Sequence, residues 1–383
     1  MEVNLIKNVM LVFGTRPEAI KMAPLVHALR KDDKYFKVQV CVTGQHRRLL
    51  DQALEIFGIK PDIDLNLMKL DQDLSNLSAS ILLEMRKVII NLKPDIILVH
   101  GDTTTTLMTA LAGFYSDIPV GHVEAGLRTF DLKSPYPEEF NRQTVTRIAQ
   151  WHFAPTESCK LNLLAEGIPD ELITVTGNTV IDSLLWTLEQ INSNALLKDQ
   201  VVSSIDKLLP FPWRENKFIL ITGHRRENFG DSFVEICLAL RELSERYPLV
   251  NFVYPVHLNP NVQVPVNSLL AEINNIHLIE PQSYQNFVYL LSHCYIVLTD
   301  SGGIQEEAPS LGKPVLLMRD STERPEALVA GTVELVGAKT EKIVAEVINL
   351  LENEKHYEKM SKAHNPYGDG RAVERIIKIL RAI

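Results

Sequence analysis

Short apolar runs alternate with longer helical patterns along almost the whole sequence. The runs are apolar throughout, which indicates strands that are buried on both faces. Such strands belong to parallel sheets that helices cover through right-handed crossovers. The sequence therefore predicts an α/β fold with doubly wound sheets. We expect strands at Val9–Phe13, Val38–Thr43, Asp95–His100, Pro119–Val123, His152–Ala154, Ile173–Thr176, Phe218–Thr222, Asn251–Pro255, His277–Ile279, Tyr295–Thr299, Val315–Met318 and Val333–Val336.

The length of the chain and a break in this pattern indicate two domains. The 383 residues exceed what one ordinary hydrophobic core accommodates. The alternation stops at residues 191–212, a polar stretch that ends in Pro210-Phe211-Pro212 and is typical of a linker. We expect a first domain at residues 1–190 and a second at residues 191–365. An amphipathic C-terminal helix within residues 366–383 is expected to join the first domain.

Composition and motifs argue against several classes of protein. The net charge is −9 and no basic stripe stands out, which argues against nucleic acid as a partner. No signal peptide and no apolar run of membrane-spanning length is evident, so we expect a cytoplasmic protein without membrane insertion. The four cysteines are scattered, and no HExxH or Cys/His cluster suggests a metal. The absence of GxGxxG argues against a dinucleotide cofactor.

The segment Asp300-Ser301-Gly302-Gly303 has the features of a phosphate-binding turn. It follows a predicted buried strand and precedes a predicted helix, whose first N–H groups and dipole favour an anion. The glycines would let a ligand approach the backbone, and Glu307 one turn later could bind sugar hydroxyls. We interpret the turn as a site for a nucleoside diphosphate. The alternative is an ordinary strand–helix turn in which glycine serves the backbone geometry alone.

Ligands of open α/β sheets bind at the carboxyl ends of the strands, and cationic residues follow two strands there. Arg16 comes after the first strand, behind Thr15 as a predicted helix N-cap, and its guanidinium suits a phosphate. Lys21 lies one helical turn later. Arg324 precedes the helix start that Pro325 predicts. The alternative for Arg16 and Lys21 is that they are solvated charges at the start of a helix.

Three residues in the second half could complete a nucleotide site. His224 follows a predicted strand and could donate to a phosphate; otherwise it is a loop histidine bonded to backbone. Gln282 also follows a strand, and Phe287 lies on the next helix. An amide and a ring are what a pyrimidine base needs for edge bonding and packing. Phe287 is equally consistent with an ordinary core position.

Three carboxylates follow strands of the first half. Asp102 and Glu124 come directly after two predicted strands, and Glu138 lies just inside the helix start at Pro137. Like charges at one sheet edge raise some of the pKa values, which suits general acid–base catalysis. For Asp102 the alternative is a helix N-cap.

Several long motifs, in this order, closely resemble the non-hydrolysing UDP-N-acetylglucosamine 2-epimerases of bacteria. They extend from near the N-terminus to the C-terminal segment HNPYGDG. The motifs are FGTRPEAIKMAPL, HGDTTTT, GHVEAGLRT, PEEFNR, GNTVIDSL, TGHRREN, YPVHLNPNV, TDSGGIQEEAPSLGKPVL and RDSTERPEA.

This resemblance implies a glycosyltransferase-B-like fold of two Rossmann-like domains, with the active site in the cleft between them. It implies a homodimer that interconverts UDP-GlcNAc and UDP-ManNAc with no cofactor and no metal. Gln45, His46 and Arg47 resemble a region where substrate activates some members. The implied substrate contacts are Arg16, Lys21, Asp102, Glu124, His224, Gln282, Phe287, Ser301, Gly302, Gly303, Glu307 and Arg324.

The expected mechanism follows from the acidity of the sugar. The C2 hydrogen has no adjacent carbonyl, so we expect elimination of UDP to a 2-acetamidoglucal and re-addition of UDP. The resemblance implies that the product is a precursor of bacterial surface polysaccharide. Asp102, Glu124 and Glu138 would carry the proton steps, and His224 would help to stabilise the leaving group. A glycosyltransferase, a hydrolysing epimerase and a catalytically silent sensor are the alternatives.

Overall fold

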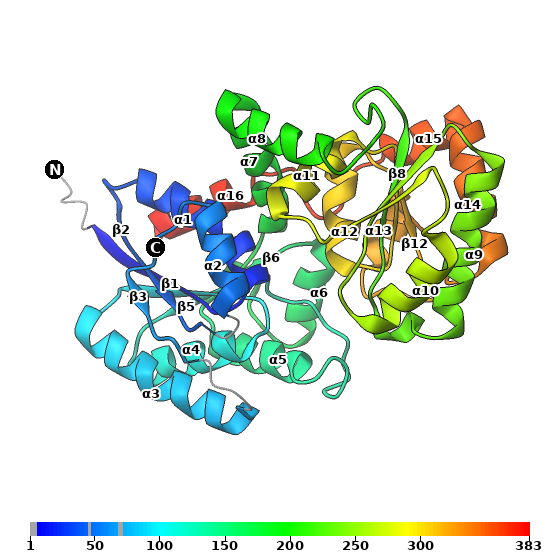
Figure 1. The fold of residues 1–383 in the computed structure, drawn as a ribbon. Helices are drawn as coiled ribbons and strands as arrows, with labels where there is room; N and C mark the ends of the chain where they lie inside the picture. Colours follow the sequence, from blue (N-terminus) through cyan, green and yellow to red (C-terminus); the bar gives the residue numbers. More distant parts are fainter. Residues whose placement is uncertain (1–5, 45–46, 68–71) are drawn as a thin grey trace. The chain divides into compact units, whose positions relative to one another are not determined.

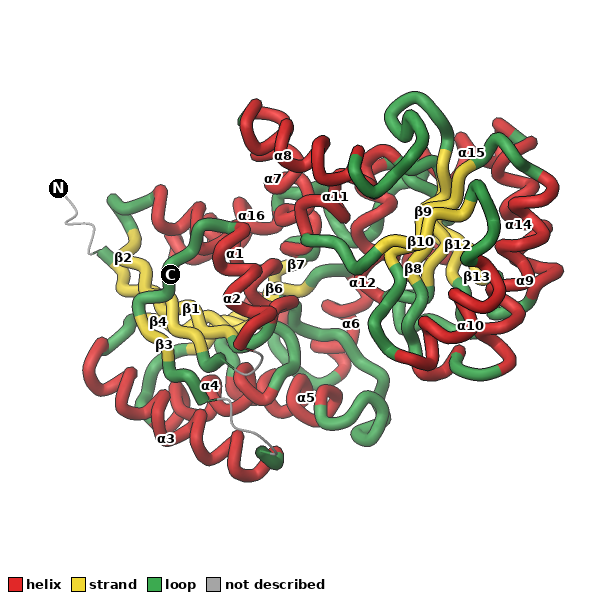
Figure 2. Tube along the Cα trace, in the orientation of Figure 1, coloured by secondary structure: helices red, strands yellow, loops and turns green. Residues whose placement is uncertain are grey.

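The computed structural model describes residues 6–44, 47–67 and 72–383, and the chain divides into two compact units. Unit 1 consists of Met1–Ser183 and Tyr367–Ile383, and unit 2 consists of Leu184–Pro366. Each unit contains one parallel sheet with helices on both faces (Figure 1, Figure 2). This confirms the predicted α/β class with two Rossmann-like sheets.

The sheet of unit 1 has the strand order β3-β2-β1-β4-β5-β6-β7. Helices α3, α4 and α5 cover one face, and α1, α2 and α16 cover the other (Figure 1). The strands are β1 (Lys7–Phe13), β2 (Phe36–Val42), β3 (Ile63–Asp64), β4 (Ile96–His100), β5 (Val120–Val123), β6 (Trp151–Ala154) and β7 (Ile173–Val175). The helices are α1 (Arg16–Lys31), α2 (Arg47–Ile56), α3 (Leu74–Leu92), α4 (Thr104–Tyr115), α5 (Glu138–Ile148), α6 (Glu157–Ala165), α7 (Thr179–Ser193), which runs into unit 2, and α16 (Ala372–Ala382).

The sheet of unit 2 has the strand order β10-β9-β8-β11-β12-β13. Its strands are β8 (Phe218–Thr222), β9 (Asn251–Pro255), β10 (Ile276–Ile279), β11 (Ile296–Thr299), β12 (Val315–Leu317) and β13 (Val333–Leu335). Its helices are α8 (Ala195–Asp206), α9 (Asp231–Arg246), α10 (Pro260–Leu270), α11 (Tyr284–His293), α12 (Gly302–Glu307), α13 (Pro325–Ala330), α14 (Thr340–Glu352) and α15 (Glu354–Ser361).

The predicted strands are all present, with two local corrections. The two-residue strand β3 was not predicted, because it is too short to give an apolar run. Residues 191–212, interpreted as a linker, contain the end of α7 and all of α8. The polar character of α8 reflects its exposed face, since Val201 and Ile205 are buried. The segment is thus an ordered helical connection.

The order of the strands creates the same feature in both sheets. In unit 1 the chain moves outward from β1 to β3 and then returns to place β4 beside β1. In unit 2 it moves from β8 to β10 and then places β11 beside β8. Neighbouring strands at such a switch point send their following loops in opposite directions, which leaves a crevice at their carboxyl ends. Of the predicted site residues, Arg16 and Asp102 follow the switch-point strands of unit 1, and His224 and Ser301 follow those of unit 2.

The C-terminal segment is bound to unit 1 through buried hydrogen bonds. Asp182 on α7 accepts from the N–H groups of Ala372 (3.2 Å) and Val373 (3.0 Å) at the start of α16. Burial raises the pKa of Asp182 to about 6, although these hydrogen bonds oppose the shift. The carboxylate therefore caps α16 and ties it to α7, while α16 packs beside α1 (Figure 1).

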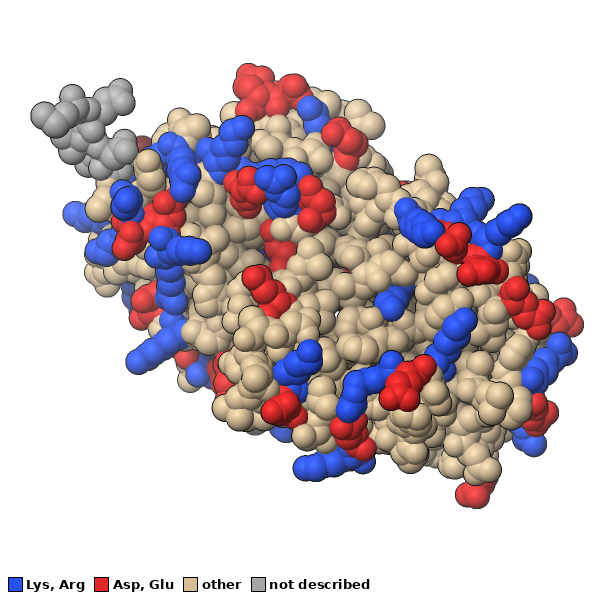
Figure 3. Space-filling model, turned by 90° about the horizontal axis from the view of Figure 1, so that it is seen from above, with Lys and Arg blue, Asp and Glu red and all other residues tan. Residues whose placement is uncertain are grey.

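The surface carries charges of both signs. Figure 3 shows Lys and Arg side chains interspersed with Asp and Glu over the face in view. In the part of the chain that the structure describes, no helix is both long and apolar enough to cross a membrane.

Candidate functional site

The loop after β1 is organised around one buried carboxylate. Thr15 caps α1, as predicted, and Glu18 completes a capping box by accepting from the N–H groups of Gly14 (3.1 Å) and Thr15 (2.8 Å). Glu18 also accepts from the hydroxyls of Thr103 (2.8 Å) and Thr106 (3.3 Å), at the start of α4. Burial raises the pKa of Glu18. Glu18, which we did not predict, therefore connects the loops after β1 and β4.

The two predicted cations of this loop have different surroundings. Arg16, the first residue of α1, is half-buried and makes no ion pair with any described residue. Lys21, one turn later, forms an ion pair with Glu124, and both side chains are largely buried. Lys21 is therefore not a solvated helix-start charge, and it contacts one of the predicted catalytic carboxylates.

Asp102 is held by side chains that the sequence did not reveal. Thr103, not Asp102, caps α4, because its hydroxyl accepts from the N–H of Thr106 at 3.1 Å. The alternative interpretation of Asp102 as an N-cap is therefore wrong. Its carboxylate pairs with Arg142 Nη2 at 2.9 Å, and Asn141 donates to its backbone carbonyl at 2.8 Å.

The pKa of Asp102 is raised to about 6. Burial is the main cause, and the negative charges of Glu124 and Glu138 raise it further against the opposing effect of Arg142. The structure thus brings Glu124 and Glu138 close enough to Asp102 to influence its pKa. A carboxyl group with this pKa populates both protonation states near neutral pH.

Glu124 follows β5 in a left-handed backbone conformation, with φ of 64°. Its carboxylate contacts Lys21 and accepts from Asn178 Nδ2 at 3.0 Å. His100 Nε2, at the end of β4, lies 3.6 Å away, and burial lowers the pKa of His100 to about 4. His100 is therefore neutral at physiological pH, and Lys21 supplies the positive charge beside Glu124.

Glu138 and Glu139 at the start of α5 have distinct roles. Glu139 is buried and accepts from the N–H groups of Thr129 and Phe130, each at 3.0 Å. Burial would raise the pKa of Glu139, but these bonds and one from Gln143 lower it overall. Glu139 thus stabilises the preceding loop. Glu138, in contrast, is only half-buried.

In unit 2 the predicted phosphate turn lies between β11 and α12. The N–H of Ser301 already donates to Thr299 Oγ1 at 2.9 Å. The N–H of Ser301 is thus engaged within the turn, and phosphate binding by the turn stays a prediction. The hydroxyl of Ser301 makes no capping bond to α12.

The glycines of this turn do not have positive φ, so backbone geometry does not require them. A Cβ at Gly302 would lie 2.7 Å from Arg324 Nη1, whereas a Cβ at Gly303 would have only Glu307 Oε2 near it, at 4.0 Å. A side chain at position 302 would therefore require the guanidinium of Arg324 to move. Arg324 in turn donates to Glu306 and to Glu323, each at 2.6 Å.

His224 lies directly beside the same turn. Its backbone N–H donates to Asp300 Oδ2 at 2.8 Å, and its ring stacks on His257 with a centroid distance of 5.3 Å. The side chain is 43% exposed, so one edge of the ring is accessible. Burial lowers the pKa of His224, and Asp300 opposes this effect.

The residues predicted for a base and a ribose occur around α11. Gln282 precedes this helix and donates to the carbonyl of Glu280 at 2.7 Å. Phe287 on α11 is half-buried, so it does not belong to the fully buried core. Glu307 is buried, and Tyr284 donates to its carboxylate at 3.4 Å.

The predicted activation region is only partly described, since Gln45 and His46 lie outside the described residues. Arg47 begins α2 and forms ion pairs with Asp51 (2.9 Å) and with Asp64. The pair with Asp64 connects the start of α2 to β3, and the pair with Asp51 lies within α2. Its side chain remains 41% exposed.

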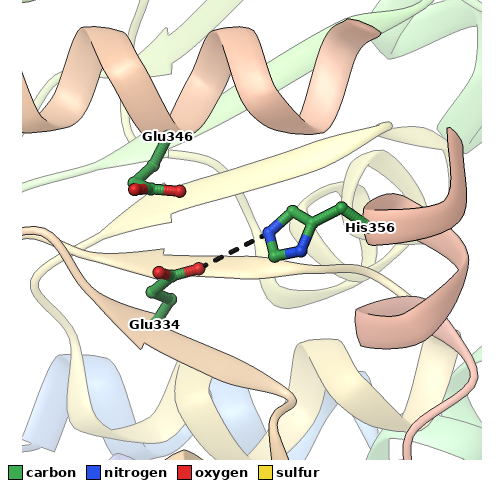
Figure 4. Close-up of side chains that lie close together, drawn as sticks. All are labelled: Glu334, Glu346 and His356. Atoms are coloured by element: carbon green, nitrogen blue, oxygen red, sulfur yellow. Dashed lines mark ion pairs between the residues drawn. The ribbon is translucent and has the colours of Figure 1, made fainter. Parts of the chain in front are cut away.

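One group of described residues has the spacing of metal ligands. Glu334, Glu346 and His356 converge from β13, α14 and α15, with donor atoms within 4.8 Å of one another (Figure 4). His356 Nε2 lies 3.6 Å from Glu334 Oε2, so the two form an ion pair when His356 is protonated. None of the predicted site residues belongs to this group.

Comparison with known proteins identifies relatives over nearly the full length. The family model for UDP-N-acetylglucosamine 2-epimerase matches residues 27–381. The UDP-N-acetylglucosamine 2-epimerase of Salmonella typhimurium is 56% identical over 375 residues, 98% of each chain. The crystal structure of the Neisseria meningitidis UDP-GlcNAc 2-epimerase bound to UDP-GlcNAc has 52% identity and a TM-score of 0.88, covering 98% of this chain and 100% of that chain.

A more distant solved structure shows a similar overlap. The Methanocaldococcus jannaschii UDP-GlcNAc 2-epimerase in complex with UDP-GlcNAc and UDP is 33% identical, with a TM-score of 0.78. It covers 98% of this chain and 100% of that chain.

Proposed function

The chain belongs to the UDP-N-acetylglucosamine 2-epimerase family, and we propose that it interconverts UDP-GlcNAc and UDP-ManNAc by elimination and re-addition of UDP. The observation that supports the mechanism is the set of three carboxylates that follow β4 and β5. Glu124 and Glu138 both raise the pKa of Asp102, while Arg142 pairs with Asp102 and Lys21 pairs with Glu124. This arrangement supports proton transfer better than it supports stability.

The proposed reaction begins with removal of the C2 proton by one carboxylate. The electron pair of the C2–H bond forms the C1–C2 double bond as the C1–O bond breaks, which gives UDP and 2-acetamidoglucal. UDP then adds back to C1 while an acid delivers a proton to the other face of C2. Asp102, with a pKa of about 6, can take either role, and Glu124 and Glu138 are the remaining candidates.

We assign the departing UDP to residues that follow the strands of unit 2. Gln282 and Phe287 would contact the uracil, and Glu307 would contact the ribose. The N–H groups of Gly302 and Gly303, together with His224, would stabilise the diphosphate.

Arg16 of unit 1, which has no ion-pair partner among the described residues, would also bind a phosphate. The side chains of Ser301 and Arg324 complete the proposed contacts. We assign the sugar to the carboxylates of unit 1.

The proposal includes a cytoplasmic homodimer that supplies a precursor of bacterial surface polysaccharide. It also includes activation by substrate at the Gln45–Arg47 segment. The resemblance of the motifs to the bacterial family supports these points. Light scattering tests the dimer, and a sigmoidal dependence of rate on UDP-GlcNAc concentration tests the activation.

Incubation of the purified protein with UDP-GlcNAc alone, followed by ¹H and ³¹P NMR, tests the reaction. We expect a stable mixture of UDP-GlcNAc and UDP-ManNAc to form without an acceptor, a metal or a nicotinamide. Accumulation of free N-acetylmannosamine and UDP would instead indicate a hydrolysing epimerase. A requirement for an acceptor would indicate a glycosyltransferase.

A further inference from the structure

A buried carboxylate without a full set of partners lies next to His224. Asp300, the first residue after β11, is 0% exposed. Its Oδ2 accepts from the backbone N–H groups of His224 and Arg225, both at 2.8 Å, and from Asn228 Nδ2 at 3.3 Å. Its Oδ1 has no hydrogen-bond partner among the described residues. Buried polar atoms are nearly always paired, so this oxygen calls for an explanation.

The ring of His224 faces the unpaired oxygen. His224 Nδ1 lies 3.6 Å from Asp300 Oδ1, slightly beyond hydrogen-bond distance. The backbone of His224 is anchored to the other oxygen of the same carboxylate, so a small rotation of the ring closes the gap. When Nδ1 faces Asp300, the other ring nitrogen, Nε2, points away from it. The stacked ring of His257 restricts the remaining rotation.

We propose that Asp300 is a positioning residue that holds His224 with Nδ1–H directed at the carboxylate and Nε2 directed at the diphosphate of the substrate. The inference rests on the proposed function, which assigns His224 to that diphosphate. The buried charge of Asp300 stabilises the protonated imidazole, whose Nε2–H then donates to the oxygen that becomes more negative as UDP leaves. A carboxylate behind an imidazole fixes the tautomer in this way.

The charged surroundings of His224 support the proposal. Burial lowers the pKa of His224, and the nearby His257 and Arg225 lower it further. Asp300 is the group that opposes these effects. Without it, His224 would be neutral over a wider pH range.

NMR of ¹³C,¹⁵N-histidine-labelled protein tests the geometry directly, with His224→Asn used to assign the signal. In the unsubstituted protein, above the pKa of His224, we expect the neutral ring to carry its proton on Nδ1. If the neutral ring carries its proton on Nε2 instead, this measurement on the unsubstituted protein alone overturns the proposal.

Asp300→Asn keeps an oxygen for the backbone N–H groups but removes the charge. We expect the pKa of His224 to fall by about one pH unit or more and the tautomer to change. Asn228→Ala is the matched control, because it removes a hydrogen bond to the same carboxylate and leaves its charge. If Asp300→Asn leaves the pKa of His224 unchanged, or if Asn228→Ala lowers it equally, the proposal is wrong.

A double-mutant cycle with UDP-GlcNAc separates positioning from general structural damage. We expect Asp300→Asn to lower kcat about tenfold or more with a smaller change in KM, and to have no further effect on kcat in the His224→Asn background. If the two substitutions instead lower kcat independently, so that their fold-losses multiply in the double variant, Asp300 does not act through His224. The NMR measurements need no turnover. If the wild-type protein proves inactive, the proposed function is refuted, but NMR still shows whether Asp300 orients His224.

Discussion

The two units have similar scaffolds but present opposite chemistry at their strand ends. Each has a switch point, between β1 and β4 in unit 1 and between β8 and β11 in unit 2. Each also has a buried carboxylate that accepts from two consecutive backbone N–H groups there, Glu18 in unit 1 and Asp300 in unit 2. The fold therefore does not determine the chemistry, which depends on the side chains that follow the strands.

The two units differ in the sign of the charged side chains that their ion pairs hold in place. Unit 1 uses cations to hold carboxylates, since Arg142 holds Asp102 and Lys21 holds Glu124. Unit 2 uses carboxylates to hold a cation, since Glu306 and Glu323 hold Arg324. This contrast suits a reaction in which one part of the substrate exchanges a proton and another part leaves as an anion.

The largest expected effect comes from the carboxylates of unit 1. Asp102→Asn or Glu124→Gln should lower kcat about 10²- to 10⁴-fold, because a proton donor or acceptor is lost, and should change the Kd of UDP little. Asp170→Asn, which removes an exposed ion pair with Lys160 in the same unit, is the control. Stopped assays and calorimetry measure the two constants. Equal losses in both would make the residue a binding group.

In unit 2 we expect the opposite division between binding and rate. Gly302→Ala should raise the Kd of UDP about 10- to 100-fold, since the new methyl group would displace Arg324 and alter the turn. Gly303→Ala, a matched change with open space around it, should cause a clearly smaller loss. The same UDP titration measures both variants. Equal Kd values for the two variants would show that the position of Arg324 does not depend on having glycine at residue 302.

A smaller effect is expected from the proposed base contact. Phe287→Ala should weaken UDP binding about 3- to 10-fold through lost packing on the ring. Phe287→Tyr should retain most of the affinity. Calorimetric titration with UDP and with inorganic pyrophosphate distinguishes a base contact from a phosphate contact. Only the Kd of UDP should change, because pyrophosphate has no base. A loss that extends to pyrophosphate would place Phe287 away from the base.

The last expected effect concerns stability, and its sign should differ between the units. The pKa of Asp102 is raised to about 6, so its stabilisation is lost as the pH rises from 3.8 to 6. In Glu323 burial raises the pKa but Arg324 and Arg319 lower it to about 2, so its stabilisation is lost as the pH falls below 4.5.

Urea unfolding at several pH values measures this difference. Relative to wild type, Asp102→Asn should gain about 1–3 kcal/mol in free energy of unfolding between pH 4 and pH 7. Glu323→Gln should instead lose about 1–3 kcal/mol as the pH rises from 3 to 5. Trends of the same sign in both variants would contradict the electrostatic contrast between the units.

Much of this contrast could be predicted from sequence because strands and strand ends are local features. Continuous apolar runs marked the strands, and the polar residues directly after them included Asp102, Glu124 and His224. The partners that set their chemistry were missed. Arg142, Asn178 and His100 come from other elements, and their contacts depend on tertiary packing. Glu18 differs from these residues, because the Thr15–Glu18 spacing is a capping-box signal that the sequence itself contains.

The most direct test of the account is the fate of the C2 hydrogen. Wild-type protein is incubated with UDP-GlcNAc in D₂O, and both UDP-sugars are followed by ¹H NMR and mass spectrometry. If UDP is eliminated and added back, UDP-ManNAc forms with deuterium at C2 and the recovered UDP-GlcNAc becomes labelled as well. Accumulation of UDP-ManNAc without deuterium at C2 would contradict the proposed elimination.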